Sequence, residues 1–451
     1  MSQIAPTLVR HWRSASSLVA LCVVATGVTV AACSGGEGPP GAAGLQGGPG
    51  PQGSIGPPGN SLDGGVPDAA LPTGCTSPCH GFGNVVDQWQ FSKHYIMKAE
   101  AVDEPAWTSA GACGNCHAID GLERRVAGEV GVADGGVVPV DVDKGHMSYQ
   151  AGGAGPALEL GYTGPGRVAI VYCTTCHAFT PTNDPHNTGS YVPGSAPLRV
   201  ASGADDFSMI EKSPEGSTTT VGQAAGKWKT GNTCVMCHKS RKDVTFYITP
   251  TDNKINSSHW GPHEGPQADV YSGLGGYHFA GATYGTSVHT TVGNGCTSCH
   301  MQPVKSNKDV PDHSMRPALA FCKSCHTTFA GTNFDVQGGQ SLVRAALKEL
   351  EAALNAKNLL TRGAAKPYPS LSPLELSDGN FHLDGTRPGS LPDGTDQLLD
   401  AATAGAVYNY LLIARSKDFG VHNPTYCKQL LFDSIKQIKG TAPTSLPVRP
   451  S

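Results

Sequence analysis

The sequence has almost no excess charge and a low share of hydrophobic residues. Lys and Arg number 32 and Asp and Glu 36, which gives a formal net charge of −4. The basic patch that nucleic-acid binding requires is not indicated, so no nucleic-acid partner is expected. Hydrophobic residues make up 39% of the chain, whereas glycine and proline contribute 58 and 34 residues. This balance predicts abundant loop, little regular sheet and little aliphatic material for a core.

The apolar run near the start of the chain is too short to span a bilayer comfortably. It covers residues 18–32, follows Arg10 and Arg13, and resembles the hydrophobic region of a secretory signal. The run ends in Val-Ala-Ala before Cys33, which resembles a bacterial lipoprotein cleavage box. We predict a signal peptide at 1–32 and a membrane-anchoring lipid on Cys33, with plain signal cleavage as the alternative. The protein is then exported to the periplasm, outer membrane or cell surface.

Glycine occupies every third position from Gly35 to Gly59, and proline pairs fill two of the intervening positions. This is the Gly-X-Y pattern that lets three polyproline chains pack around one axis. The stretch is short for a stable triple helix, so we interpret residues 33–74 as a collagen-like spacer. An extended flexible tether is favoured, and trimerisation is the alternative.

The cysteines, 15 in number, follow a motif that neither a zinc site nor a disulfide framework requires. Five CxxCH pentapeptides occur, in which two thiols add to the vinyl groups of a haem and the histidine binds its iron. Zinc ligands and disulfides need no histidine directly after every second cysteine. A sixth motif, Cys75-Thr-Ser-Pro-Cys79-His80, has one extra residue, and a local disulfide is its alternative. The predicted haem-attachment residues are Cys75, Cys79, Cys113, Cys116, Cys173, Cys176, Cys234, Cys237, Cys296, Cys299, Cys322 and Cys325.

Six haem c groups would account for nearly all cysteines and would supply the core that the composition lacks. Cys22 leaves with the signal and Cys33 takes the lipid, so only Cys427 remains, which we interpret as a buried free thiol. The predicted proximal iron ligands are the histidines of the motifs: His80, His117, His177, His238, His300 and His326.

The histidine content favours a second imidazole on each iron. Removing the six proximal histidines and His11 from the 17 in the chain leaves ten, and six are needed. A solvated loop histidine or a partner of a haem propionate is the alternative role. The rival methionine ligands, which would raise the potential, are Met97, Met147, Met209 and Met315. The distal candidates are His94, His146, His263, His289, His313 and His422.

Helical periodicity appears after the last motif. Apolar residues recur at three- and four-residue intervals over 342–354, a second helical stretch covers 397–415, and a third begins at Asn423-Pro424 and continues through Ile438. We predict a mainly α fold with extensive irregular loops, a multihaem cytochrome c fold organised around stacked haems. The haem domain would cover 75–335, and the long helices of 336–451 would pack on it or form a subunit contact.

These residues resemble the multihaem cytochrome superfamily of ammonia-forming nitrite reductase, hydroxylamine oxidoreductase and octahaem tetrathionate reductase, over roughly residues 75 to 440. Trp89-Gln-Phe-Ser-Lys-His94 resembles the WxxSxH segment that supplies a distal histidine after the first motif. Cys296 to Pro303, preceded by His289, resembles the penultimate CxxCHMP site, although Gln302 interrupts it. The resemblance also implies His313 as a distal ligand just upstream of the last motif and His263 in a histidine-bearing region upstream of the penultimate one. Residues 420–424 resemble the family's C-terminal region.

One departure from this family bears on function. Its nitrite reductases bind substrate at a haem with a CxxCK motif, and this chain has none. We therefore expect electron transfer between periplasmic or cell-surface redox proteins, with no catalytic residue. The alternative is reduction of nitrite, hydroxylamine or an oxidised sulfur compound at one five-coordinate haem, where His289 would be the acid-base residue or another ligand. A third interpretation is a structural module of a larger or homo-oligomeric cytochrome complex.

Overall fold

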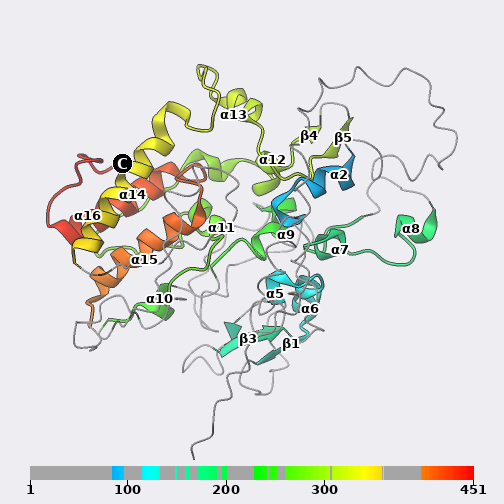
Figure 1. The fold of residues 1–451 in the computed structure, drawn as a ribbon, viewed down its shortest axis with the longest axis horizontal. Helices are drawn as coiled ribbons and strands as arrows, with labels where there is room; N and C mark the ends of the chain where they lie inside the picture. The colour runs from blue at the N-terminus through cyan, green and yellow to red at the C-terminus, as the bar shows by residue number, and fades with distance from the viewer. Residues whose placement is uncertain are drawn as a thin grey trace, which may run out of the picture. The chain divides into compact units, whose positions relative to one another are not determined.

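A computed structural model describes residues 84–95, 114–132, 148–149, 158–162, 171–189, 196–200, 228–240, 244–250, 253, 255, 260–304, 307–357, 359 and 398–451. All of them belong to one compact unit, residues 68–451. The described part is mainly helical with irregular connections, as the sequence predicted (Figure 1). The predicted signal, lipid site and spacer, together with Cys75, Cys79, His80, Cys113 and His146, lie outside the described residues.

Short helices carry the CxxCH motifs. They are α5 (Gly114–His117), α7 (Cys173–Cys176), α9 (Asn232–Val235), α12 (Cys296–His300) and α13 (Leu319–Cys325). Residues three apart in a helical turn face the same side, so one turn presents both thiols of a motif together. The other short helical elements are α2 (Val85–Gln90), α6 (Gly121–Ala127), α8 (Pro185–Thr188), α10 (Val244–Tyr247), α11 (Gln267–Ser272), η3 (Lys229–Gly231), η4 (Val288–Thr291) and η5 (Val336–Gly338).

The strands of the described residues are few and short. In one antiparallel sheet the order is β1-β3-β2, formed by Val130–Val132, Leu158–Tyr162 and Ser148–Tyr149. A hairpin joins β4 (Pro303–Val304) to β5 (Asn307–Pro311), with a register shift at Pro303. This hairpin leads the chain directly from the motif of Cys296 to His313.

Three longer helices form the C-terminal region: α14 (Gly339–Ala356), α15 (Ala401–Ser416) and α16 (Pro424–Lys439). Both α14 and α15 pack on α16, as the yellow, orange and red ribbons in Figure 1 show. Asp400 caps α15 by accepting a hydrogen bond from Thr403 N, and Asn423 caps α16 with proline at its first position. The three helices overlap the stretches with helical periodicity at 342–354, 397–415 and 423–438. No described helix is both long and apolar enough to cross a membrane.

These helices enclose an aliphatic core of their own. The side chains of Leu350, Leu411 and Leu430, one from each helix, are fully buried. Helix α15 is buried on all sides from Ala404 to Ser416, so it lies at the centre of this core. The C-terminal helices therefore form a conventionally packed core of side chains, although the hydrophobic fraction of the whole chain is low.

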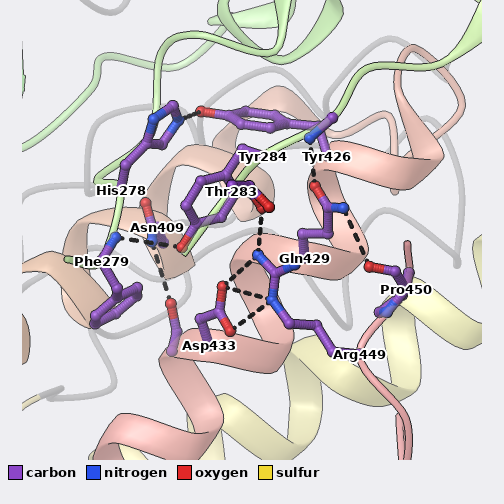
Figure 2. A network of polar contacts seen from close by, with 12 residues as sticks. His278, Phe279, Thr283, Tyr284, Asn409, Tyr426, Gln429, Asp433, Arg449 and Pro450 are labelled. Carbon is purple, nitrogen blue, oxygen red and sulfur yellow. Dashed lines mark hydrogen bonds and ion pairs between the residues drawn. The ribbon is translucent and has the colours of Figure 1, made fainter. Parts of the chain in front are cut away.

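Polar side chains attach an irregular segment to this core (Figure 2). The Asn409 side chain accepts a hydrogen bond from Tyr277 N at 2.7 Å and donates to the Tyr277 carbonyl at 2.9 Å. The Tyr426 hydroxyl accepts from Gly276 N and lies 2.9 Å from His278 Nε2. Because buried backbone groups need partners, these two side chains fix the course of the chain that leads to His289.

A carboxylate holds the chain end against α14 and makes the stability of this region dependent on pH. Burial opposes ionisation of Glu349, but Lys439 Nζ at 2.6 Å and donors from Thr444 and Ser445 hold its pKa well below the usual range. A depressed pKa means that the carboxylate stabilises the folded state fully above its unfolded pKa of about 4.3 and that this contribution is lost as pH falls.

We expect Glu349→Gln to be less stable than the wild type at pH 7 and to lose less further stability between pH 5 and pH 2. Glutamine cannot ionise, so the part of the pH dependence that comes from Glu349 disappears. Urea unfolding followed by circular dichroism at several pH values measures this. Parallel pH profiles for the two proteins would contradict the assignment.

Candidate haem sites

Histidine rings face each other in pairs. Each pair joins the histidine of a CxxCH motif to one of the distal candidates. The pairs and their ring-centroid separations are His117 with His263 at 6.3 Å, His177 with His313 at 6.3 Å, His238 with His94 at 6.0 Å, His300 with His422 at 6.1 Å and His326 with His289 at 6.1 Å.

The separations fit one metal atom between two imidazoles. A metal bound to histidine lies about 2.0–2.1 Å from the nitrogen, which is itself about 1 Å from the ring centre, so two rings on one metal are about 6 Å apart. The five observed values span only 6.0 to 6.3 Å, although the angles between the rings vary from 30° to 86°. The residues present therefore fit haem iron with two axial histidines.

Hydrogen bonds at Nδ1 orient most of these rings. The acceptors are carbonyl or amide oxygens, which cannot donate, so Nδ1 carries the proton and Nε2 keeps a free lone pair. Metal-binding histidines are held in this way. The contacts are His177 to the Ala196 carbonyl at 2.9 Å, His238 to Gln267 Oε1 at 3.0 Å, His263 to the Glu264 carbonyl at 2.9 Å, His289 to the Val421 carbonyl at 2.7 Å, His300 to the Met315 carbonyl at 2.9 Å and His313 to the Pro311 carbonyl at 2.8 Å.

Burial keeps several of the rings neutral. Burial, with a smaller effect of the neighbouring His238, lowers the pKa of His94 to about 4. Burial likewise lowers the pKa of four more rings, those of His177, His238, His300 and His313. Imidazole binds metal in its neutral form, so these side chains need lose no proton to act as ligands.

The thiols of different motifs lie beside each other. The Cys234 thiol is hydrogen-bonded to Cys296 and the Cys237 thiol to Cys116, and these contacts, together with burial, raise the pKa of Cys234 and Cys237. The fully buried Arg125 guanidinium lies 3.8 Å from Cys116 Sγ and 4.0 Å from Cys237 Sγ. Three motifs that are distant in the sequence thus meet at their cysteines.

The cysteines of the last two motifs are close enough for their charges to interact. Burial, followed by the influence of Cys322 and Cys325, raises the pKa of the Cys299 thiol to about 11. No group of three or more histidine, cysteine or acidic side chains converges within the described residues as a zinc site would need. Eight of the described cysteines are free thiols: Cys176, Cys234, Cys237, Cys296, Cys299, Cys322, Cys325 and Cys427, the last of which is buried as predicted.

An arginine of α15 supports the loop that carries His263. Arg415 is buried and donates hydrogen bonds to the carbonyls of Trp260 at 3.2 Å and Pro262 at 2.6 Å. Its own carbonyl accepts from Gly265 N at 3.1 Å, and its Nε lies 3.8 Å from the Glu264 carboxylate. Nothing in the helical segment distinguishes Arg415 from an ordinary last-turn cation, so its role is not predictable from the sequence.

Histidines that lie just before one motif face the histidine of another motif. His289, which precedes the motif of Cys296, faces His326 of the motif of Cys322. His313, which lies just upstream of the motif of Cys322, faces His177. Likewise, Met315 presents its backbone carbonyl to His300. Proximity in sequence therefore does not identify the motif that a distal histidine serves.

Two described histidines stand outside the five pairs. His186 is exposed on α8, with Nδ1 3.0 Å from Asp184 Oδ1. His278 stacks on Tyr284 with a ring separation of 4.3 Å and has its Nε2 against the Tyr426 hydroxyl. That contact engages the ring nitrogen that a metal would use, so His278 has a structural role.

Comparison with known proteins points to the same class as the motifs. No family model matches the chain. The C-type polyheme cytochrome OmcC of Geobacter sulfurreducens is 25% identical over 395 residues, which are 75% of this chain but only 45% of that protein. The solved structure of the Outer Cell Wall Cytochrome OcwA aligns with 79% of this chain and 50% of its own, at 15% identity and a TM-score of 0.38. The chain thus spans about half the length of each, and a multihaem c-type cytochrome is the class that both the motifs and the similarity to OmcC indicate.

Proposed function

We propose that the chain is an exported hexahaem c-type cytochrome that transfers electrons between periplasmic or cell-surface redox proteins. The observation that carries this proposal is the set of five facing histidine pairs, each containing the histidine of a CxxCH motif. Two axial imidazoles leave no open coordination position on an iron. Such a centre exchanges electrons and does not bind substrate.

The side chains of the chain have three tasks in this function. The motif cysteines would attach each haem covalently, and the paired imidazoles would be the ligands of its iron. Carbonyl acceptors such as those of Val421 and Met315 fix the rings, so that little rearrangement accompanies a change of redox state. When bound, each haem supplies a one-electron redox couple, and the surrounding protein sets its potential.

The contacts between thiols support an order of transfer. Because the cysteines hold the edge of each haem, motifs whose cysteines touch would bring those edges close together. Cys116 meets Cys237, Cys234 meets Cys296, and Cys299 is near Cys322. The proposed order is therefore from the motif of Cys113, through those of Cys234 and Cys296, to that of Cys322.

The sixth haem, at Cys75, Cys79 and His80, rests on the sequence motif, with His146 as the remaining distal candidate. The reductase alternative needs an open iron, and this is the haem whose motif histidine lies outside the described residues. In the proposal His289 is an axial ligand and not an acid-base residue, because its ring faces His326. Attachment to a membrane through Cys33 remains part of the proposal on the strength of the sequence.

The test is haem content and spin state in the oxidised, fully loaded protein. We expect six haems per chain by the pyridine haemochrome assay and only low-spin signals by low-temperature EPR, unchanged by nitrite or hydroxylamine. Cys173→Ser with Cys176→Ser should remove one haem. A high-spin signal that responds to either compound would favour the reductase, and fewer than six haems would refute the proposed haem set.

A further inference from the structure

The loop between α15 and α16 surrounds a buried carboxylate. Asp418 is 4% exposed and accepts hydrogen bonds from Ser416 Oγ at 2.7 Å, Gly420 N at 3.2 Å and His422 N at 3.1 Å. Lys417, Phe419 and Gly420 have positive φ angles of 56°, 49° and 86°, a conformation that residues other than glycine rarely adopt. In this conformation the loop directs these hydrogen-bond donors at the Asp418 carboxylate. Such charge-assisted hydrogen bonds stabilise a negative charge at a fixed position.

Helix α14 prevents this loop from relaxing. Gln340 Nε2 donates to the Asp418 carbonyl at 3.0 Å. A Cβ at Gly420 would lie 2.8 Å from Val343 Cγ2, so the backbone is packed directly on the helix. The position of the carboxylate is therefore set by the tertiary structure and not by the loop alone.

Asp418 lies beside an axial-ligand candidate. His422 Nδ1 is 3.0 Å from Asp418 Oδ2, and the ring faces His300 of the motif at Cys296. The ring N–H is not aligned with the oxygen, and Nδ1 has no other acceptor among the described residues. A small rotation about χ2, which is a soft torsion for histidine, would align them.

His422 differs from the paired rings whose Nδ1 acceptors are described, because none of those rings has a buried carboxylate beside Nδ1. The other acceptors are the neutral carbonyl and amide oxygens given above. The nearest comparable case is His263, whose Nδ1 is 4.0 Å from the exposed Glu264 carboxylate but donates to the Glu264 carbonyl at 2.9 Å. The same loop also provides the Val421 carbonyl for His289, so neighbouring residues support two distal rings with acceptors of different charge.

We propose that Asp418, acting through His422, lowers the reduction potential of the haem at Cys296 and Cys299 below that of the haem at Cys322 and Cys325. A carboxylate on the far nitrogen makes an imidazole a more basic ligand, and a more basic ligand favours the oxidised iron. The proposal rests on the histidine pairs of the proposed function. Asp418 is a positioning residue, since it acts on the haem only through His422.

The proposed difference in potential gives the last electron-transfer step a direction. Electrons move toward the higher potential, so an electron on the haem of Cys296 would pass to the haem of Cys322. One electron leaves the first haem, which is oxidised, and enters the second, which is reduced. Asp418 stays a carboxylate throughout, and no proton is exchanged.

The experiment is a spectroelectrochemical titration of the full-length, haem-loaded Asp418→Asn protein. We expect the midpoint of one haem to rise by about 59 mV, a tenfold change in its one-electron equilibrium, with haem content and low-spin state unchanged. Asp418→Glu, which keeps the charge, should remain nearer the wild type. Unchanged midpoints in Asp418→Asn would overturn the proposal.

His422→Met separates this proposal from the one on which it rests. If the pair is correct, this variant changes the EPR signal of one haem, and adding Asp418→Asn to it shifts no midpoint further. If His422→Met changes no haem signal, the pair itself is wrong and both proposals fail at this site. If it does change one but Asp418→Asn alone shifts nothing, only the role of Asp418 is refuted.

A third variant decides the question if Asp418→Asn does not assemble. Ser416→Ala removes one donor from the carboxylate, which then interacts more strongly with His422. The same midpoint should therefore fall, in the opposite direction to Asp418→Asn. An unchanged midpoint would refute the proposal.

Discussion

Replacing His313 by alanine is expected to convert one haem, that of Cys173 and Cys176, from low-spin to high-spin. The His313 ring lies 6.3 Å from that of His177, and the two planes are only 30° apart. Its Nδ1 donates to the Pro311 carbonyl, and its backbone N–H donates to Gln88 Oε1. Alanine keeps the backbone contact but removes the distal imidazole, so the iron loses one axial ligand. Low-temperature EPR measures the change, which should involve one haem in six.

His278→Ala is the matched control for this prediction. His278 also has a ring-nitrogen contact, but its Nε2 contacts Tyr426 and its ring stacks on Tyr284. The control should lower stability and leave every haem low-spin. If His313→Ala remains entirely low-spin, or if both variants produce the same high-spin signal, the assignment of His313 as a ligand is wrong.

Replacing Arg415 by methionine should affect both stability and one haem. The guanidinium is buried and satisfies the carbonyls of Trp260 and Pro262, which would be left without a partner. An unsatisfied buried acceptor costs about 1–3 kcal/mol, so the loss for the two carbonyls should be about 2–6 kcal/mol. The freed loop no longer holds His263 opposite His117, and a partial high-spin signal should appear. Urea unfolding measures the first effect and EPR the second.

Arg449→Met is the control for Arg415→Met, because it makes the same substitution at an arginine with a different role. Arg449 pairs with Asp433 at 2.8 Å and donates to the Thr283 carbonyl at 2.7 Å, so it secures the chain end to α16 (Figure 2). This partly exposed pair should contribute about 1 kcal/mol or less, and no haem signal should change. A spin change in this control, or none in Arg415→Met, would show that Arg415 does not position His263.

The CxxCH motifs and the three long helices are predictable from the sequence because their determinants are local. A haem-attachment motif needs only five consecutive residues, and a single turn of helix presents its thiols together. Asn423 and Pro424 mark the start of α16 by capping chemistry that acts within one turn. The apolar stretch of α15 likewise predicted a helix, but not that the helix would be buried on every side.

The histidine pairing is not predictable in this way. A distal ligand comes from wherever the folded chain passes over the other face of a haem, so its distance in sequence carries no information. His94 faces His238, and His263 faces His117, although other motifs are nearer in the sequence to both distal residues. The sequence contains enough histidines for two per haem. Only the fold decides which two histidines face each other.

The surroundings of Asp418 also show the difference between what the sequence determines and what the fold determines. The sequence by itself determined the composition of the sites: the thiols, the proximal histidines and the surplus of imidazoles, since each follows from residue type and short spacing. Only the tertiary structure decided which rings face each other and which acceptor each ring meets. Those depend on left-handed turns at Lys417, Phe419 and Gly420 packed against α14, where contacts between distant segments override local preference.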